Sequence, residues 1–320
     1  MSEAVTTRLA LGAVDYTAPV HLAALRSVAV RLAPVALSVW VSDALVGRVS
    51  ETAFLALAVI VGLPHGAFDH KVARRAFEPG HGGRWWQPFL VGYLALVSGM
   101  LLAWWIMATA ALFLFLMLAV LHFGDQDAPA ATPRHMMRIM AHGGTPIVMS
   151  AACHPAAVER LFATLVPAHA HGIILLLGGP LLMLWEAIAA GSLITYAVRG
   201  QADDWAGALD LILVSLLFAL APPLIAFSLY FAAIHAPRAF AAATPADGFH
   251  MSVLVLPLIL TSLGLALGIV IFAEGAAMSP GDNVVRTAFL LLSALTVPHM
   301  WLEWRARLAL AGPPAVQSRV

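Results

Sequence analysis

Apolar residues run along most of the chain in long unbroken segments separated by short polar stretches. A stretch of roughly 20 mostly apolar residues is long enough to cross the hydrocarbon core as an α-helix. Such segments lie at 27–46, 52–71, 87–107, 109–124, 139–153, 171–197, 206–221, 222–240, 251–273 and 284–304. The pattern predicts an all-α fold, a polytopic integral membrane helical bundle of about 8–10 transmembrane helices.

Composition narrows the class of protein further. Of the 320 residues, 61% are apolar and 11% are charged, whereas soluble domains have about 45–50% apolar and about 25% charged residues. A soluble globule has no room to bury so much apolar surface. The formal net charge is zero, so we expect no nucleic-acid partner. The single cysteine, Cys153, excludes an internal disulfide and a thiolate metal cluster.

The chain is predicted to form a single membrane domain over 1–320, with an N-terminal extension at 1–20, a transmembrane bundle at 27–304 and a cytoplasmic tail at 305–320. No cleavable signal peptide is expected. One set of alternating loops carries Lys71, Arg74, Arg75, Arg84, Arg134, Arg138, Arg199, Arg238, Arg305, Arg307 and Arg319, and the other carries Arg48, Arg160 and Arg286. This asymmetry, 11 basic residues against 3, predicts insertion in the cell (inner) membrane with both termini cytoplasmic.

The chain also carries 13 histidines, and ionisable residues inside a membrane are functional candidates by default. In the predicted topology, several fall at one depth near the cytoplasmic side. These are His65, His70, His122, His142, His235 and His299. Carboxylates follow three of these histidines at helical spacing: Asp69 after His65, Asp125 after His122 and Glu303 after His299. Metal-bound histidines usually donate their second N–H to a carboxylate or carbonyl, so these residues are candidate supporting groups or ligands.

Imidazoles without thiolates suit Fe, Cu, Zn or Ni, and a histidine or histidine–carboxylate set with open positions suits non-haem Fe(II) and O₂ chemistry. Other interpretations remain. A single histidine in a membrane bundle is more often a helix–helix hydrogen-bonding residue. Two histidines from different spans would also suit haem. A transporter would favour inverted repeats, and the sequence has no clear internal repeat.

Several of these segments together resemble the Brp/Blh family of membrane-embedded β-carotene 15,15'-dioxygenases. The stretch Gly62-Leu63-Pro64-His65-Gly66-Ala67-Phe68-Asp69-His70 resembles the family signature G-[IL]-P-H-G-A-x-D-H. His122-Phe123-Gly124-Asp125 resembles its H-F-G segment, the stretch from His142 through Pro146 to His154-Pro155 its middle region, and Pro298-His299-Met300 its P-H-M segment. The similarity runs in order from about residue 60 to about residue 300.

The resemblance implies an oxidoreductase that uses non-haem Fe(2+) and O₂ to cleave β-carotene at its central double bond, giving two all-trans-retinal molecules. A retinal-accepting rhodopsin is then a possible partner. The family's iron ligands correspond here to His65, His122 and His235, which would be the catalytic metal ligands. Asp69, His70, Asp125 and Glu303 are expected to support them.

One family position differs in this chain. The third motif, H-S-x-R-H, has a second histidine, but here the segment is His235-Ala236-Pro237-Arg238-Ala239. Alanine cannot coordinate a metal, so Ala239 leaves one ligand to be replaced. Candidate substitutes are His299, His142 and Asp69, which are predicted at similar depth. The alternative is a relative that binds carotenoid or retinal without cleaving it.

Overall fold

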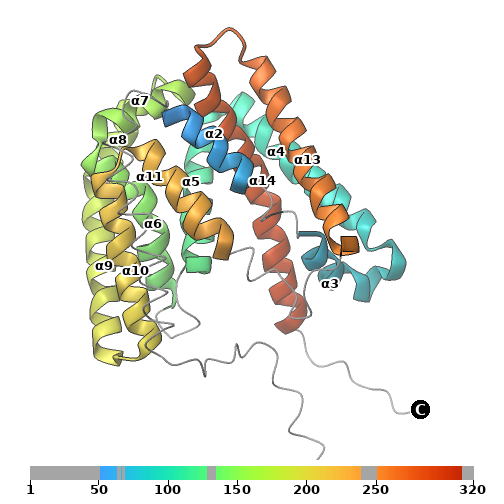
Figure 1. Ribbon diagram of the computed structural model, residues 1–320, viewed down its shortest axis with the longest axis horizontal. Coiled ribbons are helices and arrows are strands. Elements are labelled where there is room, and N and C mark those ends of the chain that lie inside the picture. The colour runs from blue at the N-terminus through green and yellow to red at the C-terminus, as the bar shows by residue number, and fades with distance from the viewer. Residues whose placement is uncertain (1–50, 63–65, 67–68, 128–134, 239–250, 312–320) are drawn as a thin grey trace, which may run out of the picture.

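The computed structural model of the protein describes residues 51–62, 66, 69–127, 135–238 and 251–311 (Figure 1). All regular elements within these ranges are helices, as the hydropathy pattern predicts. The expected extension at 1–20 and the expected span at 27–46 lie outside the described residues, as do His65 and Ala239.

The helices follow one another closely along the chain. They are α2 (Glu51–Gly62), α3 (Asp69–His81), the short 3₁₀ helix η2 (Gly82–Arg84), α4 (Trp86–Ile106), α5 (Ala108–Asp127), α6 (His135–Cys153), α7 (Pro155–Leu165), α8 (Ala170–Gly178), α9 (Pro180–Arg199), α10 (Ala202–Leu220), α11 (Pro223–Leu229), the π-helix η3 (Tyr230–His235), α13 (Met251–Glu274) and α14 (Pro280–Ala311). The last helix therefore continues into the region expected to be a cytoplasmic tail.

Four helical segments in the described part of the chain are long and apolar enough to cross a membrane: 86–106, 108–127, 170–199 and 280–308. Their outward faces are apolar. The exposed fraction is 70% for Val91, 84% for Trp105 and 80% for Val198. Exposure of such an apolar surface to water would be unfavourable, whereas contact with lipid tails is not. The chain is therefore a helical membrane protein.

The expected continuous span at 52–71 differs from the structure. Helix α2 ends at Gly62, and α3 begins at Asp69 as a separate, charged helix. On its exposed side, Arg74 donates two hydrogen bonds of 2.9 Å to Glu78. This bonding holds the pKa of the Glu78 carboxyl below its ordinary value. A helix with this many charged residues is suited to the membrane–water boundary rather than to the hydrocarbon core. The predicted span at 52–71 was therefore wrong at its C-terminal end, which includes the first residues of α3.

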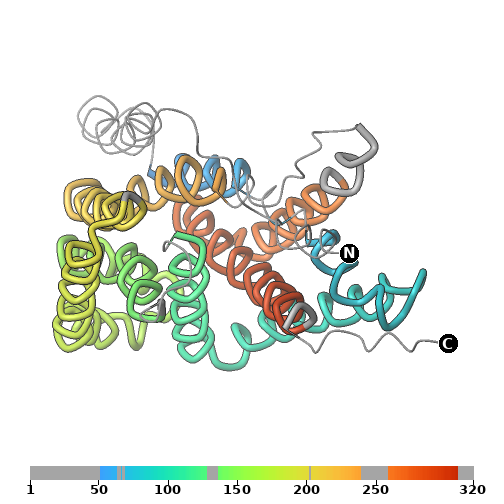
Figure 2. Tube along the Cα trace, turned by 90° about the horizontal axis from the view of Figure 1, so that it is seen from below, coloured from blue at the N-terminus to red at the C-terminus, as the bar shows by residue number. Residues whose placement is uncertain are grey.

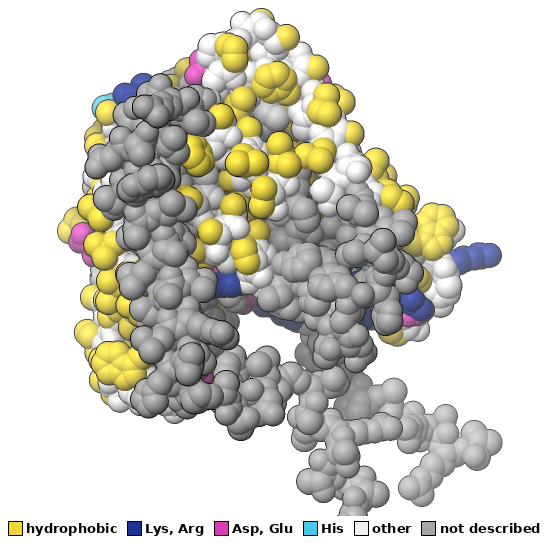
Figure 3. Space-filling view, in the orientation of Figure 1, with side chains coloured by type: hydrophobic (Ala, Val, Ile, Leu, Met, Phe, Trp, Pro, Cys, Tyr) yellow, Lys and Arg dark blue, Asp and Glu magenta, His cyan; other side chains and the backbone are white. Residues whose placement is uncertain are grey.

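Helix α14 joins two groups of helices (Figure 2). It packs against α2, α3, α4 and α13 on one side and contacts α5 and α7 on the other. Beyond α5, the helices α6, α9 and α10 form a second packed group. In the space-filling view, apolar side chains cover much of the upper surface, and basic side chains mark the lower edge near α3 (Figure 3). The functional side chains lie where the two groups meet.

Two glycines allow α5 and α6 to approach closely. A Cβ atom added at Gly124 would overlap the backbone carbonyl of Ile139, and one added at Gly143 would overlap that of Val120. Small residues at helix interfaces in membranes permit this backbone-to-backbone packing. Gly124 follows His122 by two residues, so this contact fixes the end of α5 that carries the histidine.

Candidate metal centre

Two buried histidines from distant parts of the chain face each other. The Nε2 atom of His122 on α5 lies 3.2 Å from the Nε2 atom of His235 at the end of η3. His122 is 5% exposed and His235 is fully buried. A π-helix adds a residue to a helical turn and is frequent at functional sites. Here it ends at His235, and a one-residue change of register there would rotate the imidazole away from His122.

His299 on α14 joins this pair. Its ring centroid lies 5.1 Å from that of His122, with the two ring planes nearly perpendicular. Pro298, immediately before it, lies inside α14 and lacks the backbone N–H that would continue the helical hydrogen bonding. His122 therefore contacts a histidine from η3 on one side and a histidine from α14 on the other, inside the bundle.

Carboxylates on both sides of His299 orient its ring. The Nδ1 atom of His299 lies 2.5 Å from Oδ1 of Asp69, which is 3% exposed. Its Nε2 atom lies 3.5 Å from Oε1 of Glu303, one helical turn further along α14. Gln126 in turn donates a hydrogen bond of 3.3 Å to Glu303. A carboxylate that accepts from Nδ1 sets the tautomer and presents Nε2 to the centre.

These residues fit a non-haem iron ion. The nearest ligand atoms of His122, His299 and Glu303 all lie within 4.8 Å of one another. Ligand bonds to such ions are roughly 2 Å long, so two donors across one ion stand about 4 Å apart. Imidazole nitrogens combined with a carboxylate oxygen are the donors that non-haem Fe(II) sites use. The donor set and its spacing thus agree with the chemistry expected from the histidine pattern.

An ionic network holds the segment that carries His235. Arg238 donates a hydrogen bond of 3.0 Å to Asp127 and two of 3.1 Å to the two oxygens of Asp210. Tyr230, at the start of η3, donates a hydrogen bond of 2.5 Å to the other oxygen of Asp127. The network ties η3 to the end of α5 and to α10. The residue types gave no signal for this role, because the partners are distant in sequence.

The centre lies at one end of an apolar cavity of about 370 Å³. Asp69, His122, His299 and Gly66 line the polar end. The remaining lining is almost entirely apolar and comes from α4, α5, α11, α13 and α14. It includes Leu90, Leu94, Val97, Phe115, Leu263 and Leu267. Ligand sites of this kind combine an apolar wall with a few converging polar groups.

Other predicted residues lie elsewhere. His142 is buried on α6, with Nε2 2.9 Å from the hydroxyl of Tyr196 on α9, and it is not in the group of converging ligand atoms. Asp125 pairs with Arg307. His70 is half-buried on α3 and does not line the cavity. Among the described candidates, the structure thus brings together His122, His235, His299, Asp69 and Glu303.

A further buried ion pair was not predicted. Arg138, expected in a cytoplasmic loop, lies on α6 with only 1% of its surface exposed, and its guanidinium is 2.8 Å from Asp204. Its guanidinium also lies 4.1 Å from the ring centroid of Tyr196. Hydropathy alone places Arg138 in water because it is charged. The sequence does not show that Asp204, on another helix, neutralises this charge in the protein interior.

The fold and the cluster define a class: helical membrane proteins with a buried histidine–carboxylate cluster, able to hold a metal ion, at the end of an apolar chamber. Residues 56–304 match the family described as beta-carotene 15,15'-dioxygenase, and the chain belongs to this family. This membership confirms the family resemblance of the sequence motifs.

Two relatives extend this comparison. A beta-carotene 15,15'-dioxygenase from uncultured marine bacterium 66A03 is 29% identical over 262 residues, covering 78% of this chain and 90% of the relative. The probable beta-carotene 15,15'-dioxygenase Blh of Halobacterium salinarum is 29% identical over 323 residues, covering 86% and 92%. No solved structure matches the chain significantly.

Proposed function

We propose that this protein cleaves β-carotene with O₂ at the central 15,15' double bond and releases two all-trans-retinal molecules. The observation that carries the proposal is the meeting of His122 and His299 at the end of an apolar cavity, with His235 in contact with His122 behind them. Family membership supports the same reaction. A bound non-haem Fe(II) would supply the activation of O₂.

We further propose that His122, His235 and His299 hold the iron, with Glu303 beside them. The family motif has a histidine ligand where this chain has Ala239. In this proposal, His299 supplies the ligand that is missing at that position. His65 remains a proposed ligand from its motif. It lies outside the described residues, but the next residue, Gly66, lines the same cavity as Asp69, His122 and His299. Asp69 acts on the metal through His299, by holding Nδ1 and directing Nε2 inward.

The rest of the chain would bind and orient the substrate. A carotene has no polar group, so recognition depends on the shape of the cavity and on contacts with apolar side chains such as Leu94 and Leu263. The same walls keep water from the centre. The exposed apolar faces of α4 and α13 let the substrate reach the cavity from the bilayer without crossing water.

We also propose that the protein lies in the cell membrane with both termini cytoplasmic, as its basic residues indicate. We propose further that a rhodopsin accepts its product.

Expression in a β-carotene-producing bacterium tests the proposal, with retinoids extracted and separated by chromatography. We expect retinal to appear as β-carotene declines. The His122→Ala variant should leave β-carotene intact at equal protein level. His171→Ala serves as the control, because the His171 side chain is 73% exposed. Persistent β-carotene with well-expressed native protein would favour the second candidate, a relative that binds carotenoid or retinal without cleavage, for which Ala239 is the motivating residue.

A further inference from the structure

Three aromatic rings follow one another along α11 and η3 and end at the metal centre. The ring centroids of Phe227 and Phe231 are 5.6 Å apart, and their ring planes are 9° from parallel. The rings of Phe231 and His235 follow at 5.9 Å and 17°. Residues four positions apart lie on nearly the same face of a helix, and these centroid distances are typical of offset-stacked rings. We call Phe227, Phe231 and His235 the aromatic row.

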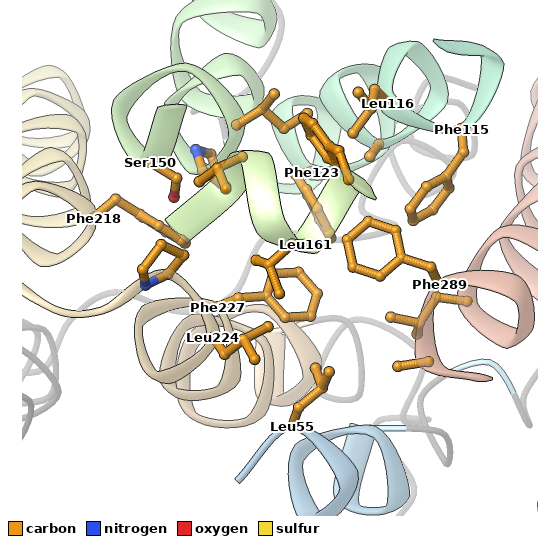
Figure 4. A pocket seen from close by; sticks show the side chains of 18 residues that line it. Leu55, Phe115, Leu116, Phe123, Ser150, Leu161, Phe218, Leu224, Phe227 and Phe289 are labelled. Atoms are coloured by element: carbon orange, nitrogen blue, oxygen red, sulfur yellow. The ribbon is translucent and has the colours of Figure 1, made fainter. Parts of the chain in front are cut away.

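The two ends of the aromatic row have different surroundings. Phe227 borders a second, smaller apolar cavity of about 90 Å³ (Figure 4). Phe227 and Phe231 both line the larger cavity, together with His122 and His299. His235 is fully buried and lies outside both linings. Phe231 is therefore the member of the row that contacts His235 and also faces the larger cavity.

A glycine at the end of α2 makes room for Phe231. A Cβ atom added at Gly62 would overlap the ring of Phe231, so the ring occupies the space that a side chain at position 62 would need. Phe231 is 3% exposed, and Gly62 is among the buried residues of α2. The φ angle of Gly62 is not positive, so this glycine is required for space rather than for its backbone conformation. Gly62 is also the first residue of the motif that contains His65.

His299 and His235 are oriented by different kinds of contact. Carboxylates contact both ring nitrogens of His299. The ring of His235 packs against two aromatic side chains. Phe231 lies nearly parallel to it, and Phe123 lies nearly perpendicular, with its centroid 4.7 Å away. Rotation of the imidazole about its Cβ–Cγ bond would break the parallel contact with Phe231 and move Nε2 away from its present place 3.2 Å from His122.

We propose that Phe231 is a positioning residue of the metal centre. Its ring, placed against Gly62, holds the imidazole of His235 in the orientation in which Nε2 faces His122. The proposal rests on the proposed function, because it takes His235 as an iron ligand. It adds a role for Gly62, which has no side chain to bind a metal. This glycine keeps free the space that the ring needs.

Substitution of the ring tests the proposal, with Fe(II) alone as the probe. Phe231→Leu keeps an apolar side chain but removes the flat face that lies against His235. We expect Fe(II) affinity to fall about tenfold or more, as is typical when a group that orients a metal ligand is lost. The EPR spectrum of the Fe(II) protein treated with nitric oxide should change as well, which a loss of stability alone would not produce. Phe113→Leu on α5 is the matched control, because Phe113 is 39% exposed, and it should change neither.

A second substitution displaces the ring without removing it, and it also serves if Phe231→Leu does not accumulate. Gly62→Ala places a methyl group in the space of the ring and should lower Fe(II) affinity to a similar degree. Leucine is shorter than phenylalanine and leaves room for that methyl group. The double variant should therefore bind Fe(II) no more weakly than the weaker of the two single variants, because both changes act through one contact. Gly99→Ala, at an open position of α4, is the control.

Two results would overturn the proposal. One is native Fe(II) affinity with an unaltered EPR spectrum in Phe231→Leu. The other is a double variant in which the losses of the two single variants multiply, because Gly62 and Phe231 would then act independently. Failure of the proposed ligand set is seen separately: His235→Ala would bind Fe(II) as tightly as the native protein, and the role of Phe231 would be wrong with it. If the native protein binds Fe(II) through His235 but forms no retinal, the proposed reaction fails and the role of Phe231 stands.

Discussion

His122 and His235 are 113 positions apart in sequence, yet their Nε2 atoms lie 3.2 Å from each other in the buried interior. Two helices, α5 and α11–η3, must pack in one register to produce this distance. The two nitrogens are close enough to share a hydrogen bond, and equally to bind one metal ion together. From α14, His299 and Glu303 bring ligand atoms within 4.8 Å of one of His122.

The first prediction concerns this pair. Either His122→Ala or His235→Ala should lose bound iron and cleavage activity together, since each change removes one nitrogen ligand from a small donor set. Iron is measured by elemental analysis of the purified protein. His142→Ala is the contrasting variant, because His142 is buried against Tyr196. An iron content in His142→Ala as low as in His122→Ala would contradict the assignment.

The second prediction concerns Asp69 as a positioning residue. Asp69→Asn keeps the size of the side chain but weakens the hydrogen bond that orients His299. We expect iron affinity to fall about 10- to 100-fold. The EPR spectrum of the Fe(II) protein treated with nitric oxide should change as well, which loss of stability alone would not produce. An unaltered spectrum and affinity would show that His299 needs no such support.

The third prediction tests whether His299 replaces the missing family histidine. His299→Ala alone should lose iron, and Ala239→His alone should change iron content little because the donor set is already complete. In the double variant His299→Ala with Ala239→His, the family histidine returns and iron content should partly recover. Higher iron content in Ala239→His alone would show instead that the native site lacks a ligand.

The fourth prediction concerns Arg238. Its removal leaves the carboxylates of Asp127 and Asp210, both less than 10% exposed, without their shared cation. We expect Arg238→Ala to destabilise the protein by about 3–5 kcal/mol. Arg238→Lys should recover part of this loss, because a lysine keeps the charge but lacks the two separate nitrogens with which Arg238 bonds Asp127 and Asp210. Thermal unfolding in detergent measures both. Equal melting temperatures for the two variants would argue against this network.

The fifth prediction concerns the close contact of α5 with α6. Gly124→Ala places a methyl group against the backbone of Ile139 and should cost about 1–3 kcal/mol of stability. Gly99→Ala is the matched control, because Gly99 also lies in a helix but has open space at its Cβ position. There, alanine should be neutral or slightly stabilising. Equal effects of the two substitutions would show that α5 and α6 can separate without cost.

Much of the site is visible in the sequence as residue types. His122, His235 and His299 stand beside glycine, proline or aromatic residues in motifs of one family, and Glu303 follows His299 at helical spacing. The motifs could not rank the substitutes for the absent histidine. His142 and His299 have the same predicted depth in the membrane, but only His299 lies beside His122.

The sequence by itself determined that the protein is a helical membrane bundle, because long apolar runs leave no other arrangement that satisfies the backbone in lipid. It also predicts the ligand chemistry, because imidazoles and carboxylates without thiolates suit few metals. Only the tertiary structure decided which of these side chains meet. The depth of a side chain in the membrane follows from its position in a predicted span. Which helices lie next to one another depends instead on how the helices pack. Contacts such as Gly124 against Ile139, and ion pairs such as Arg238 with Asp210, determine that packing.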